Sequence, residues 1–405
     1  MRYYDALETR SADARAADLA KDLPVQIARA QSTPGMMALL DGVAPGDITS
    51  AAELAALPIL RKSALGRAQT ANLPLGGLSA RAPGAFGHIF QSPGPIYEPG
   101  GIEHDWWRVG RFLYAAGVRS GDIVQNCFGY HLTPAGMIFE SGARAVGATV
   151  LPAGTGQTDL QVRAASDIGS TVYAGTPDYL RVILERADEI GVTLKFDKAV
   201  VGGGALFQSL RDDYAARGIA CLQNYATADL GNIAYESAAL EGMIVDEGVI
   251  VEIVTPGTGN PVDPGDVGEV VVTTLNPDYP LIRFATGDLS AVMPGPSPCG
   301  RTNMRINGWM GRADQTTKIK GMFVRPEQVA EFVARHTEIT RARVIASREG
   351  EADVMVVQVE ATGGDAADFE ASIAQVLKLR GRVELVAPGS LPNDGIVISD
   401  LRVYK

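Results

Sequence analysis

The sequence is poor in cysteine. Among 405 residues there are three, Cys127, Cys221 and Cys299, and they are widely separated, without the paired spacing of metal ligands. Such usage is typical of a protein kept in a reducing compartment, and it argues against a structural zinc ion. The segment from Met1 to Asp5 lacks the apolar core of a signal peptide, and no apolar run is long enough to span a bilayer. We therefore expect a cytoplasmic protein.

The sequence also has fewer basic residues than acidic ones. The chain has 36 lysines and arginines against 47 aspartates and glutamates, a formal net charge of -11. No general basic field is available to attract nucleic acid or an acidic membrane surface. An anionic ligand must therefore be bound by groups placed locally around it.

Apolar runs alternate with helical patterns through the middle of the chain. A strand predicted over 123–127 is followed by a helix of small residues and by the apolar run 148–154, and a helix over 179–190 precedes a strand at 199–201. This rhythm indicates an α/β fold, with a parallel sheet and helices on its faces. From 249 to 293 closely spaced strands predict a small antiparallel barrel. Helices are predicted over 11–29 and 105–116.

The stretch 311–327 divides the chain. Polar and charged residues lie between two glycines, and an apolar triplet then leads into Pro326 and a helical pattern. It is interpreted either as a surface hairpin or as a hinge before a small C-terminal domain. Beyond it, helices at 326–335 and 368–379 and strands at 342–346, 354–360 and 383–386 predict a compact α+β unit. A chain of this length ordinarily forms more than one domain, and we predict domains over 1–313 and 314–405.

Three motifs occur in the order 225–231, 283–288 and 311–321. They are Tyr225-Ala226-Thr227-Ala228-Asp229-Leu230-Gly231, Arg283-Phe284-Ala285-Thr286-Gly287-Asp288, and Gly311-Arg312-Ala313-Asp314 followed by lysines and a glycine. Together they resemble motifs of the phenylacetate-CoA ligase family of adenylate-forming acyl-CoA ligases. The resemblance implies that ATP and a carboxylic acid, expected to be aromatic, give an acyl-adenylate, which coenzyme A then converts to a thioester. It also implies ATP or AMP, Mg²⁺ and coenzyme A as ligands, and a homodimer.

The same resemblance implies roles for single residues. Asp288 would accept hydrogen bonds from the ribose hydroxyls, and a turn aspartate that caps amides is the alternative. Asp229 would hold Mg²⁺, and Asp314 would be the pivot of the C-terminal domain. The remaining candidates are Thr227 and Arg312 as catalytic groups, Gly203, Gly204, Ala205, Asn224, Tyr225, Arg283 and Lys320 at the nucleotide, and Tyr130, His131 and Gly154 at the acyl group. A structural histidine and a tight strand-to-helix turn at the glycines remain open as alternatives.

Two segments depart from the family pattern. Phosphate-binding loops present successive backbone N–H groups to the anion. The segment 90–101 instead contains Pro93, Pro95 and Pro99, which donate no hydrogen bond, and Glu98, which adds negative charge. A rigid proline turn is therefore the expected structure there. Ile396 stands where relatives have a lysine that neutralises charge during adenylation. Two further hypotheses follow: a nucleotide- or acyl-CoA-binding protein that has lost adenylation, and an acyl transferase that receives a preformed adenylate.

Overall fold

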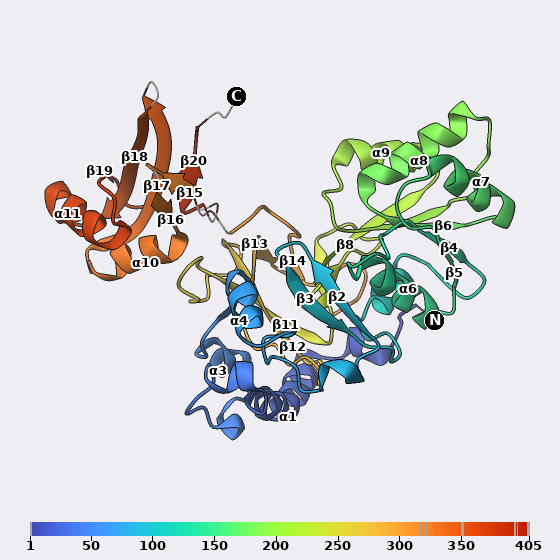
Figure 1. Ribbon diagram of the computed structural model, residues 1–405, viewed down its shortest axis with the longest axis horizontal. Helices are drawn as coiled ribbons and strands as arrows, with labels where there is room; N and C mark the ends of the chain where they lie inside the picture. The colour runs from blue at the N-terminus through green and yellow to red at the C-terminus, as the bar shows by residue number, and fades with distance from the viewer. Residues whose placement is uncertain are drawn as a thin grey trace. The chain divides into compact units, whose positions relative to one another are not determined.

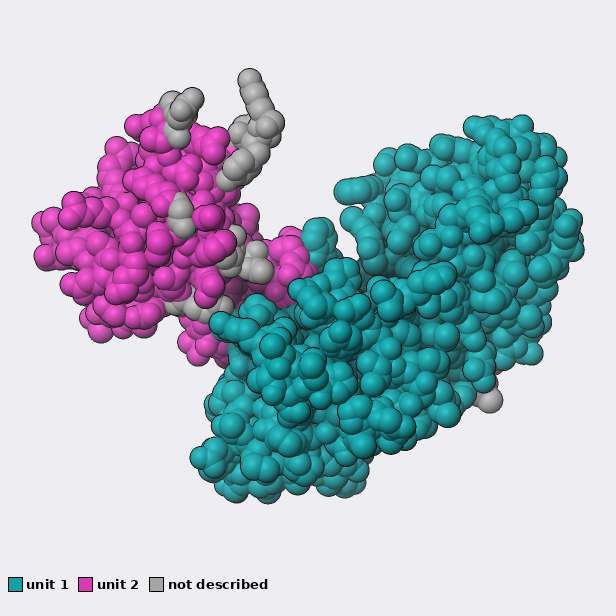
Figure 2. Space-filling view, viewed as in Figure 1, with its two compact units in different colours: residues 1–251, 272–284, 293–309 teal, residues 252–271, 285–292, 310–405 magenta. Residues whose placement is uncertain are grey.

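The computed structural model of the chain describes residues 2–313, 315, 317–320, 322–349, 352–392, 394 and 396–402. They form two compact units (Figure 2). The first unit comprises residues 1–251, 272–284 and 293–309, and the second comprises 252–271, 285–292 and 310–405. The predicted boundary between residues 313 and 314 stays a prediction.

The first unit opens with helices. The Ser11 hydroxyl accepts a hydrogen bond from the Ala14 amide at 3.1 Å and caps helix α1, Ala12–Gln31, whose face with Leu23 and Ile27 is buried. This confirms the helix predicted over 11–29. The short elements that follow are α2 (Pro34–Met37), α3 (Ala51–Ala55), β1 (Leu60–Arg61), the 3₁₀ turn Lys62–Ala64, α4 (Leu65–Ala71), β2 (His88–Ser92) and β3 (Ile96–Gly100).

The first unit contains a parallel sheet (Figure 1). Its strands are β4 (Ile123–Asn126), β5 (Thr149–Pro152), β6 (Val172–Gly175), β7 (Lys198–Val201) and β8 (Ala220–Thr227), in the spatial order β5-β4-β6-β7-β8. Adjacent strands in this order pair in parallel. The connecting helices are α6 (Ala135–Ala145), α7 (Thr158–Ile168), α8 (Pro177–Glu189) and α9 (Gln208–Ala216). The predicted alternation of strand and helix is confirmed.

Helix α5 is shorter than predicted. It spans Gly110–Ala115 instead of starting at Asp105. Asp105 has a positive φ of 47°, and its two carboxylate oxygens accept hydrogen bonds from the Gly110 amide at 3.0 and 3.1 Å. A side chain that bonds the backbone in this way favours a turn over a helix, so the helix begins only after it.

Further strands extend the sheet beyond β8, and the pairings from β8 through β9 and β10 to the next strand are antiparallel. They are β9 (Gly231–Tyr235), β10 (Met243–Val245) and β14 (Arg305–Ile306), followed in the spatial order by β13 (Phe284–Met293), β12 (Val267–Thr274) and β11 (Val249–Val254). The strands predicted between 249 and 293 are therefore present, and they continue the edge of the same sheet. The third of them begins at Phe284, not at Leu281 as predicted.

The C-terminal part of the second unit has the predicted α+β order. A hairpin of β15 (Thr317–Ile319) and β16 (Met322–Val324) leads into α10 (Pro326–Ala334). A four-stranded sheet in the order β19-β18-β17-β20 then forms, and α10 and α11 share its hydrophobic core (Figure 1). These elements are β17 (Ile339–Glu349), β18 (Ala352–Ala361), α11 (Ala366–Leu377), β19 (Arg382–Val386) and β20 (Ile398–Asp400). Over the described ranges, no helix has the length and apolar character needed to cross a membrane.

Candidate functional site

The segment 90–101 forms a tight hairpin. Strands β2 and β3 pair antiparallel from His88 with Gly100 to Ser92 with Ile96, and only residues 93–95 make the turn. This confirms the predicted proline turn. Part of the backbone N–H groups of this ribbon pair within its own ladder, the Gln91 N–H donates to the Leu132 carbonyl at 2.8 Å, and Pro93, Pro95 and Pro99 have no N–H, so the hairpin offers few donors to a phosphate.

Glu98 lies in β3 and is fully buried, with 0% of its surface exposed. Neither of its carboxylate oxygens has a hydrogen-bond partner within normal limits. Burial, followed by the negative charge of Asp229, raises the pKa of Glu98 to about 8, although Ser92 and Lys62 act in the opposite direction. In the absence of a bound cation, Glu98 therefore carries a proton at neutral pH.

Asp229 lies in the turn between β8 and β9. Its side chain is fully buried, and Oδ2 is 2.6 Å from the ammonium of Lys62, which comes from the 3₁₀ turn after β1. The second oxygen, Oδ1, is buried without a hydrogen-bond partner. The Thr227 hydroxyl accepts a hydrogen bond from the Leu230 amide at 3.2 Å and so closes the same turn. Sequence reasoning missed Lys62, because 167 positions separate it from Asp229.

Five of the nucleotide candidates lie just after β7 or in β8, and these two strands pair in parallel. The loop of Gly203, Gly204 and Ala205 follows β7 and is exposed, while Asn224 and Tyr225 in β8 are buried. A Cβ added to Gly202 would lie 2.5 Å from Asn224 Oδ1, so this contact requires a glycine. Asn224 donates through Nδ2 to Asn232 Oδ1 at 2.9 Å, which leaves its buried Oδ1 without a partner. The arrangement suits a ligand that presents an N–H donor, as adenine does.

Asp288 and Arg312 form an ion pair in the second unit. Arg312 Nη1 donates to Asp288 Oδ1 at 2.9 Å, and the two backbones are linked by an isolated β-bridge. The Asp288 side chain is 11% exposed and that of Arg312 is 55% exposed. The structure therefore brings these two motif residues together. Arg283 is instead buried, and its guanidinium donates to the carbonyl of Leu57.

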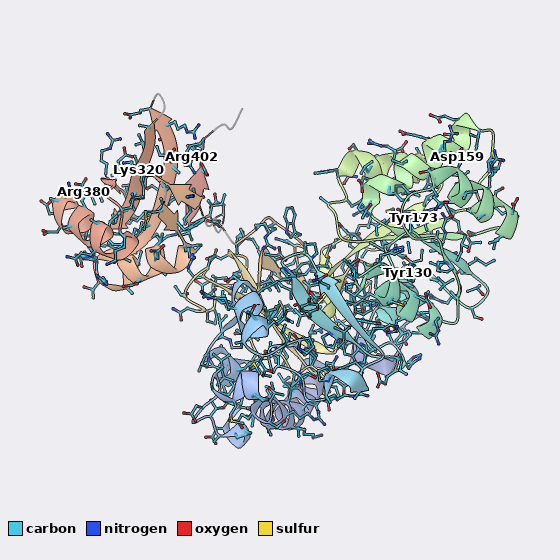
Figure 3. The ribbon with its side chains drawn as sticks, in the orientation of Figure 1. Tyr130, Asp159, Tyr173, Lys320, Arg380 and Arg402 are labelled. Atoms are coloured by element: carbon cyan, nitrogen blue, oxygen red, sulfur yellow. The ribbon has the colours of Figure 1, made fainter. Side chains whose placement is uncertain are left out.

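Of the three acyl-group candidates, Tyr130 and Gly154 are connected through Asn126, whereas the His131 side chain is exposed. The hydroxyl of Tyr130, a residue labelled in Figure 3, accepts a hydrogen bond from Asn126 Nδ2 at 2.8 Å and donates to Glu140 Oε2 at 3.0 Å. Burial and then the Glu140 charge raise the Tyr130 pKa. The amide of Gly154 donates to the Asn126 carbonyl at 2.9 Å, so Asn126 connects Tyr130 with Gly154. The His131 side chain is exposed.

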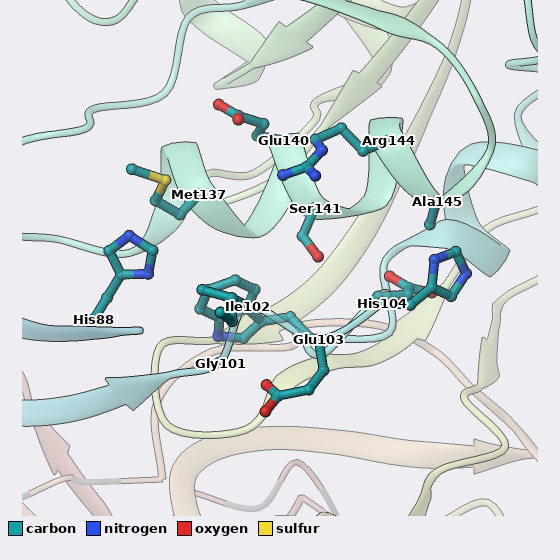
Figure 4. Close-up of a pocket in the computed structure, with 12 residues that line it drawn as sticks. His88, Gly101, Ile102, Glu103, His104, Met137, Glu140, Ser141, Arg144 and Ala145 are labelled. Atoms are coloured by element: carbon teal, nitrogen blue, oxygen red, sulfur yellow. The ribbon is translucent and has the colours of Figure 1, made fainter. Parts of the chain in front are cut away.

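A cavity of about 190 Å³ lies beside helix α6. Met137, Glu140, Ser141 and Arg144 of the helix line it together with His88 of β2 (Figure 4). Glu140 connects this cavity to Tyr130 through the hydrogen bond just described. None of the predicted site residues lines it.

Besides Arg312, two predicted residues belong to the segment 311–321, Asp314 and Lys320. Lys320 is exposed at the turn of the β15–β16 hairpin, with a φ of 46°, and its amide donates to Asp353 Oδ2 at 3.0 Å. Asp314 lies outside the described residues. Ile396, which occupies the expected lysine position, is 38% exposed.

Comparison with known proteins shows which family the chain belongs to. No protein-family model matches the chain. The phenylacetate-coenzyme A ligase of Pseudomonas putida is 30% identical over 339 residues, which are 79% of this chain and 75% of that protein. The chain belongs to the phenylacetate-coenzyme A ligase family. The ligase of the same name from Thermus thermophilus is 32% identical over 262 residues, 62% of this chain and 59% of that protein. That match spans less than two thirds of the Thermus enzyme.

The fold of this phenylacetate-coenzyme A ligase family member agrees with a solved structure. The crystal structure of 2-hydroxyisobutyryl-CoA ligase, in the postadenylation state with R3-HIB-AMP, superposes with a TM-score of 0.73 at 23% identity. The superposition covers 99% of this chain and 92% of the other. The predicted adenylate-forming fold is therefore confirmed.

The family resemblance implies Mg²⁺ at Asp229, and the residues present fit that ion. Asp229 Oδ1 is a buried hard oxygen without a partner, although Oδ2 is occupied by Lys62. Within the described parts of the chain there is no group of three or more His, Cys, Asp or Glu side chains that could hold a metal. Water, a phosphate or a single further carboxylate would have to complete the coordination.

Proposed function

We propose that the chain is an AMP-forming acyl-CoA ligase that joins a carboxylic acid, most simply an aromatic one, to coenzyme A. Family membership carries the proposal, because the relatives at 30% and 32% identity are phenylacetate-coenzyme A ligases. Two pairings add support. Asp288 with Arg312, and Asp229 with Lys62, each place a carboxylate beside a cation at a motif predicted to contact the nucleotide.

Each residue of the site has a separate proposed role. Asn224 Oδ1 and Tyr225 would receive adenine, and Asp288 would hold the ribose hydroxyls. Lys62 and Arg312 would stabilise the negative charge that develops as the acid attacks the α-phosphate, because preorganised cations lower the energy of such a transition state. Tyr130 and Gly154 would border the acyl group, and a divalent cation at Asp229 would supply further positive charge.

The change from adenylation to thioester formation would use motion at Asp314, between domains of 1–313 and 314–405. We further propose that the protein is a homodimer in the cytoplasm. The three cysteines are all unpaired, which fits a reducing compartment.

One observation favours a second function. The β2–β3 turn consists of only three residues, and Ile396 replaces the expected lysine. An acyl transferase that uses a preformed adenylate would tolerate both changes, because its reaction starts after pyrophosphate has left.

Two assays separate these functions. Acid-dependent pyrophosphate release, measured over a panel of aromatic and aliphatic acids, tests the ligase. Coenzyme A consumption with synthetic acyl-adenylate tests the thioester step. The ligase proposal expects both reactions, and the transferase expects only the second. Absence of both reactions across the panel would contradict the two functions together and leave a binding protein.

A further inference from the structure

Cys299 lies in a tight turn of the first unit, in the loop between β13 and β14. The loop is stiffened by Pro294, Pro296 and Pro298. The Gly300 amide donates to the Ser297 carbonyl at 3.0 Å and closes the turn. Gly300 has a φ of 84°, and a Cβ there would lie 2.4 Å from the Tyr3 hydroxyl, so the turn requires a glycine. This turn places the Ser297 hydroxyl 3.0 Å from Cys299 Sγ.

The guanidinium of Arg301 lies beside the same sulfur. Its Nη1 donates to Cys299 Sγ at 3.5 Å, and its Nε donates to the Glu8 carboxylate. Arg301 is only 5% exposed, and its remaining nitrogen, Nη2, is buried without a hydrogen-bond partner among the described residues. Buried N–H groups in folded proteins nearly always have an acceptor. Because Nη1 and Nη2 are bonded to the same carbon, an oxygen atom attached to the sulfur would be a suitable acceptor for Nη2.

The surroundings of the sulfur favour a thiolate. Burial raises the pKa of the Cys299 thiol. Hydrogen bonds from Ser237, Ser297 and Arg301 outweigh this effect and lower the pKa to about 7. Arg2 adds a second positive charge nearby, because its Nη2 donates to the Cys299 carbonyl at 3.2 Å. Close to half of the Cys299 side chains are therefore ionised at neutral pH.

The other two cysteines have different surroundings. Cys127 and Cys221 are buried, and burial raises the pKa of each thiol to about 12. Cys299 is partly exposed. Because the thiolate is the nucleophilic form of cysteine, Cys299 alone combines access to solvent with a large thiolate fraction.

We propose that Cys299 is a reactive thiol that hydroperoxides oxidise to a sulfenic acid, with Ser297 and Arg301 as the groups that stabilise its thiolate. The sulfur attacks the terminal peroxide oxygen, so an S–O bond forms while the O–O bond breaks. The sulfur loses two electrons to the peroxide, and the departing oxygen takes up a proton to give water or an alcohol. The oxygen added to the sulfur would accept the hydrogen bond that Arg301 Nη2 lacks. A thiol reverses the reaction through a mixed disulfide.

The test uses the full chain in its native, reduced form at pH 7. Alkylation by iodoacetamide is followed at each cysteine by peptide mass spectrometry, and we expect Cys299 to react at least about a hundredfold faster than Cys127 and Cys221. After treatment with hydrogen peroxide, dimedone should label Cys299 as a sulfenic acid. Dithiothreitol added before dimedone should prevent this labelling.

Ser297→Ala tests the role of the hydroxyl. We expect alkylation of Cys299 to slow by about twofold to fivefold, because a smaller thiolate fraction is partly offset by the greater nucleophilicity of each thiolate. Ser166→Ala is the matched control: the Ser166 hydroxyl of α7 donates to the Thr193 carbonyl at 3.2 Å, and its loss should leave the rate unchanged.

Three results would each overturn the proposal. They are equal alkylation of all three cysteines in the native protein, no dimedone product at Cys299, and an unchanged alkylation rate in Ser297→Ala. Wild type alone decides the first two, so the proposal can fail even if the variant does not fold. None of these measurements depends on ligase activity, so the proposed function and this proposal succeed or fail separately.

Discussion

The carboxylate of Asp288 can contact both Arg312 and a ribose. Its side chain remains 11% exposed while Arg312 occupies Oδ1, and a carboxylate can accept several hydrogen bonds at once. We therefore expect Asp288→Ala to weaken AMP binding by roughly 1.5–3 kcal/mol, the scale of losing charge-assisted hydrogen bonds. Calorimetric titration measures this loss. The exposed Asp263 of the same unit provides a control, because Asp263→Ala should leave the affinity unchanged. Equal AMP affinity in wild type and Asp288→Ala would remove Asp288 from the site.

Single residues also show which parts of the candidate site the local sequence can predict. Asp288 and Arg312 belong to motifs, and the structure brings them together, although their contact with a nucleotide stays a prediction. The sequence predicts Glu98 only as a negative charge beside the phosphates, whereas the structure buries it and the charges of Asp229 and Lys62, from distant parts of the chain, act on its pKa. A local pattern carries no information about such contacts.

At the scale of elements, Asp105 controls the start of α5 and should make stability depend on pH. Burial, followed by the charge of Asp246, raises the Asp105 pKa from 3.8 to about 7, against hydrogen bonding from Gly110 and the charges of Arg108 and Arg111. The native state therefore retains a proton that the unfolded chain loses. Stability from this group is complete below pH 3.8 and declines as the pH rises to about 7.

The variant Asp105→Asn should remove this decline. Asparagine keeps an acceptor for the Gly110 amide and tolerates the positive φ at this position. At pH 8 we expect the variant to be more stable than the wild type by about 1–2 kcal/mol, less than the full shift implies because the residue is partly exposed. Urea unfolding at several pH values measures the difference. The same pH dependence in both proteins would show that Asp105 is ionised in the native state.

The elements themselves were largely predictable, because hydrophobic periodicity is a local signal. Strands β4, β5 and β7 and helices α6 and α8 follow the predicted alternation, whereas α7 and β6 were not predicted as elements. The start of α5 was not predictable from that periodicity, since the apolar spacing continues from Trp106 to Ala116 while the Asp105 side chain diverts the backbone. Side-chain capping competes with periodicity at element ends.

At the scale of the molecule, the predicted fold is confirmed, while two segments are predicted to lack charges that the family resemblance implies. Negative charge accumulates as a carboxylate attacks an α-phosphate, and a preorganised cation is worth on the order of 10²–10³ in rate. Ile396 supplies no charge, and the β2–β3 turn offers little. We expect Lys62 and Arg312 to compensate only in part, because each is already paired with a carboxylate. Adenylation should therefore be slow.

The variant Ile396→Lys should raise the rate of adenylation and leave the thioester step unchanged. Ile396 is 38% exposed, so a lysine fits without disturbing a packed core. The measurement is acid-dependent pyrophosphate release by wild type and variant, alongside coenzyme A consumption with synthetic adenylate. Leu401→Lys adds the same charge at an exposed position in the same terminal segment and should give no gain. Fast pyrophosphate release by the wild type, with no gain in Ile396→Lys, would show that another residue already supplies the charge, and Lys62 would then be the first to replace.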